Sequence, residues 1–522
     1  MKTTECLTTR RSFLATAAAA AAATHPFLRA VAQSQPAPFL RYDVKSPEGI
    51  AMLKSYAVAI EAMLKLPPTH PHNWYRNALV HTIDCPHGNW WFLLWHRGYT
   101  GLFEQTVRQY SGNPKFAFPY WNWTEEPAVP PQFFEGILNP KHPAYIESYE
   151  KFHEAFQGPV EDWFNNMSPA QLTQAKLNNF PTADAFFDGI KSKGFFPDRD
   201  KARRDYAPGY PLTPLAAFSV SHRVIDCALA VRSFLDFGSA VTANHYVLSK
   251  FSIFEGMAHN KVHNDFEGFM QDNMSPVDPI FMMHHSNIER VWLEWTAQME
   301  ALHLDPLPTE GLDVWKAEPF VFFIGPDGKP APGQNAGAYL AVDQFNYRYV
   351  GGKTGLAAAH MLMASKPSRF AGQRFEATQN PKAADPRGAV FNLALPAPLL
   401  KSSPAAASSR DSEFILEVTV EGMPDQYGEE LNLFVNPPEG VLGDETPGLL
   451  ASLSFFGLHH HHSSSGSVVF EVPFCDYVRC VVDKKCTYPP KVLVVKSRPK
   501  SLLAAAGNTN PLQVTAIAVR GL

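Results

Sequence analysis

The sequence contains few charged residues, few cysteines and no long apolar run beyond its N-terminus. Charged residues make up 18% of the 522 residues, below the ~25% usual for soluble proteins, which favours a compact protein over a disordered binding protein. Six cysteines are too few to form a disulfide scaffold in a chain of this length. No stretch of about 18 apolar residues follows the N-terminal segment, so we expect no membrane span in the mature chain.

The first 32 residues have the features of an export signal. A Thr-Arg-Arg-Ser-Phe-Leu motif at residues 9–14 is followed by a run of alanines and by Ala-Val-Ala at residues 30–32. We expect residues 1–32 to be a twin-arginine signal, read by the twin-arginine export machinery, and the mature protein to be periplasmic or secreted. Losing this basic segment makes the net charge of −5 more negative, so neither nucleic acid nor an anionic membrane is an expected partner.

The composition changes along the chain and predicts two domains. Residues 33–350 are rich in aromatic side chains and in helical spacing, which predicts a mainly α domain. Residues 351–410 are rich in Pro, Ala, Ser and Gly, which is typical of a linker. In residues 411–522, short alternating β-branched runs broken by Gly and Pro predict a small all-β sandwich or barrel.

Three helices are predicted near the start of the α domain. Residues 49–66 carry apolar side chains at spacings of three and four and stop at two consecutive prolines. A second, short helix is expected over residues 73–81, and a third begins near Asn89, a good N-cap residue. Residues 130–210 are rich in Pro, Asn and Phe, and we expect long loops with short helices there.

Two groups of histidines carry the strongest signal, and the second group has helical spacing. His259 and His263 are four residues apart, so on a helix they share one face and can hold one metal ion. Zinc proteases use this spacing with a glutamate after the first histidine; Asn260 stands there instead, so a hydrolase would lack its general base. A third ligand is expected from the His-His pair at residues 284–285, whose side chains point about 100° apart on a helix.

The first group combines a loop and a helix. His87 and His96 are nine residues apart, which would place them on opposite faces of a single helix. Pro86 and Gly88 place His87 in a loop, so both side chains can converge, with His81 arriving from the end of the preceding helix. Neutral imidazole suits copper, iron, nickel and zinc. Two sets of three histidines therefore predict a paired metal site without naming the metal.

Together these segments resemble the type 3 copper family of tyrosinases, catechol oxidases and molluscan haemocyanins. The resemblance covers roughly residues 41–350 and rests on five motifs: Pro86-His87 through Trp95-His96-Arg97, Pro-Tyr-Trp-Asn-Trp at 119–123, His-Asn-Lys-Val-His at 259–263, Asp-Pro-Ile-Phe-Met-Met-His-His at 278–285 and Tyr-Arg-Tyr at 347–349. In plant-type polyphenol oxidases the Tyr-x-Tyr motif closes the catalytic domain and contacts an arginine near its start. Arg41 is the candidate for that arginine here.

The resemblance implies a four-helix bundle that holds two copper ions, with dioxygen as co-substrate and small phenols as substrates. It implies ortho-hydroxylation of monophenols and oxidation of o-diphenols to o-quinones. The alternatives are a catechol oxidase without the first activity and a haemocyanin-like oxygen carrier. The implied ligands are His81, His87 and His96 for one copper ion and His259, His263 and His285 for the other, while His284 is left to packing.

Two features of the sequence depart from the family pattern, and one cysteine matches part of that pattern. His81 and His87 are separated by a shorter loop than in many members, and Glu289 stands where an aspartate is usual. Cys85 lies in a Cys-x-His position that, in fungal tyrosinases and molluscan haemocyanins, forms a thioether with the histidine. We therefore expect a crosslink between Cys85 and His87, with a free buried cysteine as the alternative.

The resemblance also suggests how the site is assisted and covered. Glu255 and Asn260 match a pair that holds a water proposed as the base for phenol. In related proteins a C-terminal domain inserts a bulky side chain over the site, for which Phe434, Phe455 and Phe456 are candidates. Residues 459–462 are four histidines; with Cys475, Cys480 and Cys486 they form either a copper-capturing cluster or a chance one, in which one disulfide is an option.

Overall fold

The computed structural model describes residues 37–351, 368–379, 388–401, 413–422, 429–440, 442–443, 446–458, 462–463, 466–497 and 512–522. The signal predicted over residues 1–32 lies outside these residues, and so do His459, His460 and His461. Residues Phe39–Leu522 form one unit by their contacts. Within it, we call the described residues up to 351 the helical domain and those from 368 onward the β domain.

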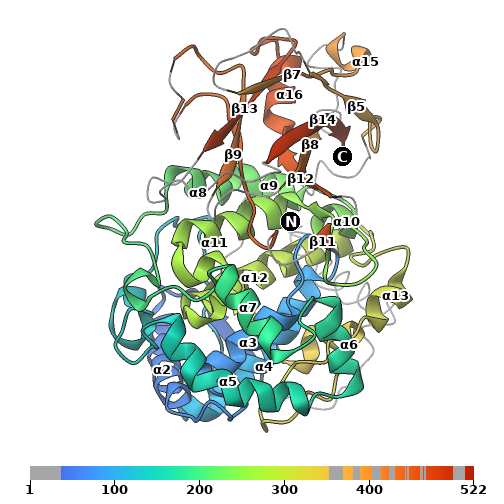
Figure 1. Cartoon of the computed structure of the whole chain (residues 1–522). Coiled ribbons are helices and arrows are strands. Elements are labelled where there is room, and N and C mark those ends of the chain that lie inside the picture. Colours follow the sequence, from blue (N-terminus) through green and yellow to red (C-terminus); the bar gives the residue numbers. More distant parts are fainter. Residues whose placement is uncertain are drawn as a thin grey trace, which may run out of the picture. The chain divides into compact units, whose positions relative to one another are not determined.

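The helical domain is built around helices α2, α3, α4, α11 and α12 (Figure 1). The side chain of Ser46 caps α2, and that of Asn73 caps α3 by accepting a hydrogen bond from the Tyr75 amide. Asn89 caps the turn before α4 instead of the helix itself, because its Oδ1 accepts from the Trp91 amide at 3.0 Å. The helices are α2 (Pro47–Leu64), α3 (Trp74–Asp84), α4 (Phe92–Ser111), α5 (Tyr149–Asn165), α6 (Pro169–Leu177), α7 (Ala183–Ser192), α8 (Pro214–Ser219), α9 (His222–Leu229), α10 (Phe234–Phe237), α11 (Asn260–Phe266), α12 (Ile280–Ala301) and α13 (Leu312–Ala317).

One helix in the middle of this domain is longer than the sequence indicated. Helix α5 has 17 residues, so the prediction of short helices only is wrong here. Ser148 caps its start, and Phe152, Phe156, Val160 and Phe164 follow at spacings of four along one buried face. This apolar stripe outweighs the cost of Pro159 inside the helix.

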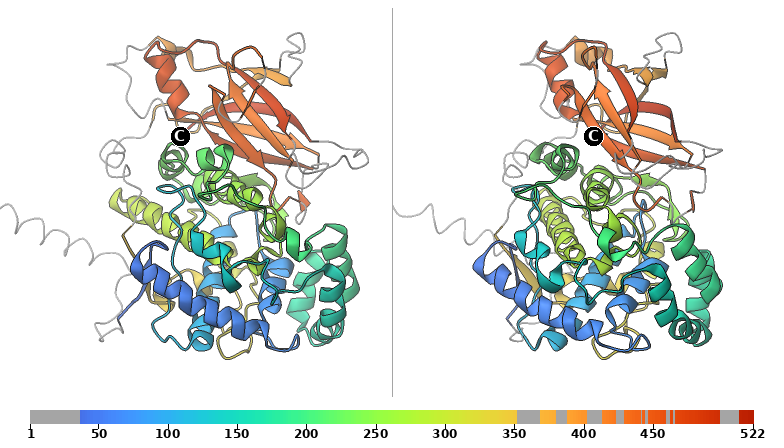
Figure 2. Two further views of the ribbon diagram at one scale, coloured as in Figure 1. Left: turned by 90° about the vertical axis from the view of Figure 1, so that its left-hand side faces the viewer. Right: turned by 60° about the vertical axis from the view of Figure 1, so that its left-hand side comes forward.

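The β domain is built on two five-stranded sheets, with strand orders β10-β9-β13-β7-β6 and β3-β12-β8-β14-β5, in which β3 comes from the helical domain (Figure 2). The β domain also contains helix α15 (Ala397–Leu400) and helix α16 (Cys475–Val482). This confirms the prediction of a mainly α domain followed by a β-rich domain. The strands are β1 (Phe39–Tyr42), β2 (Val247–Leu248), β3 (Lys250–Phe251), β4 (Tyr347–Val350), β5 (Arg374–Glu376), β6 (Thr378–Gln379), β7 (Ala389–Asn392), β8 (Phe414–Glu421), β9 (Glu430–Val435), β10 (Leu449–Ser454), β11 (His462–Ser463), β12 (Ser467–Pro473), β13 (Lys491–Ser497) and β14 (Gln513–Gly521).

The segment expected to be a linker contributes to these sheets. Strands β5, β6 and β7 lie within residues 351–410, and β5 and β7 pair antiparallel with β14 and β13. The buried side chain of Phe391 in β7 shows why, since an apolar residue within this Pro- and Ala-rich stretch gains more by packing than by exposure. The described parts of this range therefore belong to the β domain.

Several contacts join the two domains. Strand β3 of the helical domain pairs in parallel with β12, and β2 pairs with β11. The ammonium group of Lys250 lies 2.7 Å from the Glu471 carboxylate, and Lys261 pairs with Glu430. Among the described residues, no helix is both long and apolar enough to cross a membrane.

Candidate metal centre

Three segments bring the first group of histidines together. His81 lies in the last turn of α3, His87 in the loop that follows, and His96 in α4. The ring centroids are 6.0 Å apart for His81 and His87, 5.6 Å for His81 and His96, and 5.8 Å for His87 and His96. Each side chain is at most 3% exposed. The short loop between His81 and His87 therefore does not prevent the three rings from gathering.

Hydrogen bonds at Nδ1 fix two of these rings. His81 Nδ1 lies 2.8 Å from the carbonyl oxygen of Asn273, and His96 Nδ1 lies 2.8 Å from that of Phe92. Because a carbonyl oxygen only accepts hydrogen bonds, each Nδ1 carries the proton and each Nε2 keeps its lone pair. This is the state in which a histidine binds a metal ion through Nε2.

The Nε2 atoms of the second group of histidines lie close together. His259 ends a π-helical turn (η4, Phe254–His259), His263 lies in α11 and His285 in α12. Their Nε2 atoms meet at 3.3 Å between His259 and His285 and at 3.3 Å between His263 and His285. Ligand nitrogens placed ~2.0–2.1 Å from a tetrahedral metal ion lie about this far apart. The spacing therefore fits one metal ion held by the three rings.

The Nδ1 atoms of this second group are also oriented from behind. His263 Nδ1 donates to the Met270 carbonyl oxygen at 2.6 Å, and His259 Nδ1 faces Asn260 Oδ1 at 2.8 Å. His284 differs, because its Nδ1 accepts a hydrogen bond from Trp123 Nε1 at 3.2 Å. In that tautomer Nε2 of His284 carries the proton, so neither nitrogen offers a lone pair to a metal. The geometry therefore favours His285 over His284 as the third ligand.

The two groups lie side by side. The rings of His96 and His285 stack with their centroids 4.3 Å apart and an interplanar angle of 11°, and those of His87 and His259 lie 5.7 Å apart. Burial lowers the pKa of His96 and the pKa of His263 to about 3, and it lowers the pKa of His285 as well. The rings are neutral at neutral pH, which suits a pair of adjacent transition-metal ions.

Residues 62–298 match the family model described as the common central domain of tyrosinase. Residues 62–298 are therefore similar to the central domain of the tyrosinases, which are type 3 copper proteins. The tyrosinase HcTyr1 of Hahella sp. (strain CCB-MM4) is 26% identical over 223 residues, which cover 41% of this chain and 38% of that protein. The haemocyanin G-type units Oda to Odg of Enteroctopus dofleini are 28% identical over 278 residues, which cover 52% of this chain and 8% of that protein.

A solved structure agrees with the fold over most of its length. The latent aurone synthase (polyphenol oxidase) from natural source has a TM-score of 0.55 and 15% identity, covering 93% of this chain and 91% of that one. The matches to the two curated relatives span well under half of each relative's length. The comparisons thus show a tyrosinase-type central domain and the fold of the chain.

The Tyr-x-Tyr motif closes the helical domain as the family pattern implies. Arg41 Nη1 donates to the Tyr349 hydroxyl at 2.8 Å, and the Arg41 guanidinium lies 3.6 Å from the ring centroid of Tyr347. Glu289 takes part in this closure, since it accepts hydrogen bonds from Arg97 at 2.9 Å and from the Tyr347 hydroxyl at 2.7 Å. Glu289 thus ties α4 and α12 to β4.

Glu255 lies in the π-helical turn η4, four residues before His259. Its carboxylate accepts from the Gly88 amide at 2.7 Å and from the Ser239 hydroxyl at 2.7 Å. Burial raises the pKa of Glu255 to about 8, although both donors act to lower it. Glu255 thus supports the loop that carries His87.

Asn260 and Cys85 each lie beside a ligand histidine. Asn260 Oδ1 faces His259 Nδ1, and within the described residues no hydrogen bond joins Asn260 to Glu255. Cys85 Sγ lies 3.8 Å from His87 Nδ1 and 3.7 Å from the side-chain oxygen of Asn273. Cys85 is buried and its sulfur is not bonded to the ring, and burial raises the pKa of its thiol.

A buried acid–histidine network behind the first group was missed from the sequence. Asp84 accepts hydrogen bonds from Trp95 Nε1 at 2.8 Å and from the Tyr246 hydroxyl at 2.8 Å, and it lies 3.2 Å from His245 Nε2. His245 Nδ1 lies 2.6 Å from Glu318. Burial alone would lower the pKa of His245, but the two carboxylates outweigh it and raise this pKa to about 9.

The network connects segments that no local pattern relates. Asp84 ends the helix of His81, and Trp95 directly precedes His96, so this carboxylate braces two ligand-bearing segments. His245 and Glu318 lie far away in the sequence, in stretches without a recognisable motif. The only signal in the sequence was the charged residue Asp84 at the end of a mostly buried helix.

Phe456 of the β domain lies directly over the histidines. Its ring stacks on His263 with centroids 4.0 Å apart and meets His87 edge-on at 4.9 Å. The other two candidates lie elsewhere: Phe455 packs edge-on against Phe470, and Phe434 belongs to a separate small apolar cluster. Phe456 is therefore the one of the three that closes the site.

Proposed function

We propose that this protein is a latent copper-dependent phenol oxidase, which hydroxylates monophenols at the ortho position and oxidises o-diphenols to o-quinones. The observation that carries the proposal is the pair of buried histidine triads that meet at the His96–His285 stack. The first triad, His81, His87 and His96, would hold one copper ion, and the second, His259, His263 and His285, the other. The bound copper pair supplies two-electron exchange between dioxygen, the co-substrate, and the phenol.

The residues around the triads would keep this geometry constant during turnover. The carbonyl groups of Asn273, Phe92 and Met270 hold three imidazoles with Nε2 toward the centre. The Arg41–Glu104 ion pair, fully buried at 2.8 Å, fixes α4 against the first strand. These residues behind the histidines would fix the direction of each imidazole and keep water out of the site.

Hydroxylation of a monophenol also requires removal of the phenolic proton. A base formed by Glu255 and Asn260 with water remains a prediction from the family resemblance. Because both Glu255 oxygens already accept hydrogen bonds, we assign Glu255 to positioning the His87 loop. The Glu255→Gln variant separates these roles, because glutamine keeps an oxygen for the Gly88 amide. Unchanged rates with both substrate classes support the positioning role, whereas selective loss of monophenol turnover supports the base.

Latency follows from the place of Phe456. A phenol that approaches the second triad meets this ring, which already occupies the face of His263. Gly457 allows the approach, because a Cβ there would lie 2.8 Å from His87 Cβ and its φ is +82°. The related aurone synthase structure is titled as a latent form, which supports the proposal. The β domain would have to move before a substrate binds.

The test is oxygen uptake by the copper-loaded protein before and after removal of the β domain, with a monophenol and with a catechol. Turnover of both substrates, appearing on removal, is the expected result. Turnover of catechol alone would make the protein a catechol oxidase, the second candidate. Reversible oxygen binding without turnover of either substrate would indicate a haemocyanin-like carrier and refute the proposal.

We also propose the Cys85–His87 thioether, supported by the 3.8 Å separation of Sγ and the ring. Its formation breaks the S–H bond of Cys85 and a C–H bond of the His87 ring, with dioxygen, the proposed co-substrate, accepting the two electrons and two protons. It also removes the reactivity of the thiol. In the copper-loaded protein, a peptide map should show Cys85 resistant to alkylation. Full alkylation of Cys85 in denatured, copper-loaded protein would leave it a free buried thiol.

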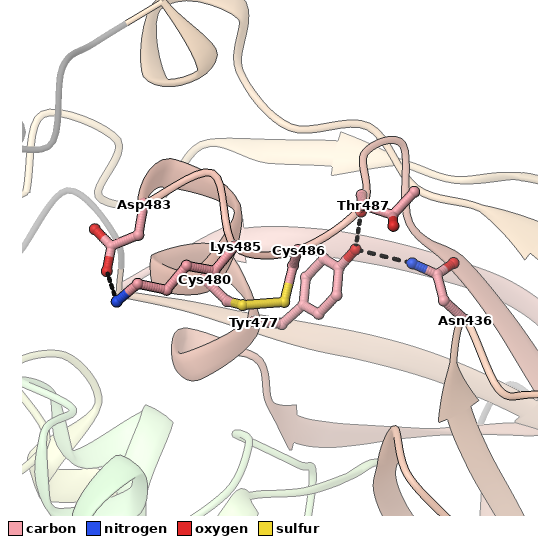
Figure 3. The surroundings of a disulfide bond; sticks show 7 residues. All are labelled: Asn436, Tyr477, Cys480, Asp483, Lys485, Cys486 and Thr487. Atoms are coloured by element: carbon pink, nitrogen blue, oxygen red, sulfur yellow. Dashed lines mark hydrogen bonds and ion pairs between the residues drawn. A yellow bond between two sulfur atoms is a disulfide. The ribbon is translucent and has the colours of Figure 1, made fainter.

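Export by the twin-arginine route remains a proposal that rests on residues 9–14 and the alanine run. Replacing both arginines by lysine should keep the protein inside the cell if the proposal is right. A copper-capturing role for the C-terminal histidines loses its cysteine ligands. Cys480 and Cys486 form a disulfide (Figure 3), and Cys475 lies against Cys227.

A further inference from the structure

Two cysteines from different domains face each other across the domain boundary. Cys227 lies on α9 of the helical domain, and Cys475 is the first residue of α16 in the β domain. Their sulfur atoms are 3.2 Å apart, and both side chains are buried. The sequence separates them by 248 residues, so no local pattern relates them.

The surroundings of the two cysteines favour a reaction between their thiols. The hydrogen bond from Cys227 lowers the pKa of Cys475 against the effect of burial, with further help from Arg479, while the pKa of Cys227 is raised. Disulfide bonds form by attack of a thiolate, so a thiol with a lowered pKa beside a second thiol is the reacting arrangement.

A reagent can reach the pair from solvent. Cys227 and Cys475 line a cavity of about 230 Å³ together with Arg223, Asp226, Glu413 and Arg479. The Arg223–Asp476 ion pair at its rim, 2.9 Å long, has side chains 38% and 52% exposed. The cavity therefore opens to solvent beside two otherwise buried thiols.

We infer that Cys227 and Cys475 form a disulfide that covalently joins the helical domain to the β domain. Two thiols yield one disulfide and release two protons and two electrons, which a small disulfide such as oxidised glutathione accepts as it becomes two thiols. Closing the gap to the ~2.05 Å of a disulfide requires a shift of about one ångström shared by two side chains.

The bond has a consequence for the covered site that rests on the latency proposed above. Helix α16 follows strand β12, which pairs with β3 of the helical domain. A disulfide at the start of α16 would keep the β domain attached even after the chain between the domains is cut. Release of Phe456 from the histidines would then require reduction as well as cleavage.

The crosslink is tested first, without reference to copper or activity. The full chain is incubated with oxidised glutathione, alkylated under denaturing conditions and mapped without reduction. We expect a peptide pair containing Cys227 and Cys475 and the loss of two alkylatable thiols, with Cys480–Cys486 as internal standard. The Cys227→Ser and Cys475→Ser variants should each lack the pair. Free Cys227 and Cys475 in protein whose Cys480–Cys486 bond is complete would overturn the inference.

The consequence is tested with a site-specific protease sequence inserted between residues 352 and 367. After cleavage of the oxidised protein, the two fragments should migrate together on a non-reducing gel and separate on reduction. In the Cys227→Ser variant they should separate on the denaturing gel without reductant. Activity that rises on cleavage alone, with the crosslink intact, would refute the requirement for reduction but leave the disulfide standing. An inactive protein with the crosslink present would instead refute the proposed function.

Discussion

Replacing Phe456 by alanine should activate the intact protein. The ring is 2% exposed and contacts His263 at 4.0 Å and His87 at 4.9 Å. Burying a phenylalanine contributes about 1.5–3 kcal/mol, and favourable ring pairs add about 0.5–1.5 kcal/mol. We call the state in which Phe456 covers the histidines closed. If this state loses about 2–4 kcal/mol, the fraction of molecules with an uncovered site rises by roughly 30- to 700-fold, up to the point where all molecules are open.

The assay is oxidation of a catechol by the copper-loaded, uncut protein. Phe455→Ala is the matched control, because Phe455 is the adjacent residue and is equally buried but packs on Phe470 instead of the histidines. Thermal unfolding of both variants shows whether they lose similar stability. If Phe455→Ala activates the protein as much as Phe456→Ala at equal loss of stability, activation comes from a loosened β domain, and the blocking role of Phe456 is refuted.

Three further predictions concern the centre and its supports. His285→Ala should lose about half of the bound copper by elemental analysis, whereas His284→Ala, whose Nδ1 accepts from a tryptophan, should keep it; equal losses would contradict the ligand assignment. The pKa of His245 is about 9 in the folded protein, above the ~6.5 of the unfolded chain. Protonation of His245 therefore stabilises the fold by an amount on the order of 3 kcal/mol, which is fully present below pH ~6.5. This contribution is lost as the pH rises through 9. Urea unfolding at pH 6 and 9.5 should show that loss in the wild type but not in His245→Gln, and parallel behaviour would refute it. Glu104→Ala leaves the fully buried Arg41 unpaired and should cost about 3–5 kcal/mol, while Glu154→Ala, which breaks an exposed pair, should leave the unfolding midpoint unchanged.

Local features of the sequence were sufficient to indicate the ligand groups. The spacing of His259 and His263 and the Pro-His-Gly turn at His87 act over a few residues, where backbone geometry alone decides direction. Arg41 and Tyr349 could be paired only because the family pattern relates them, and the structure shows that contact at 2.8 Å.

Predictions failed where packing altered local geometry. Nothing in the sequence around Glu255 indicated that its carboxylate would accept hydrogen bonds from Gly88 and Ser239. The Pro- and Ala-rich segment after residue 350 was expected to be a linker, but β5 and β7 pair with strands more than a hundred residues away in the sequence. Strand pairing of this kind depends on partners that composition does not reveal.

The sequence by itself determined the tyrosinase-type motifs, the order of the α and β domains and the two groups of histidines, because these depend on residue type and short spacing. Only the tertiary structure decided which phenylalanine covers the histidines, which histidine of the 284–285 pair faces the centre, and that Cys227 meets Cys475. Each of these is a contact between segments far apart in the chain. Such contacts are set by how whole helices and sheets pack against one another, and no local pattern of residues encodes that packing.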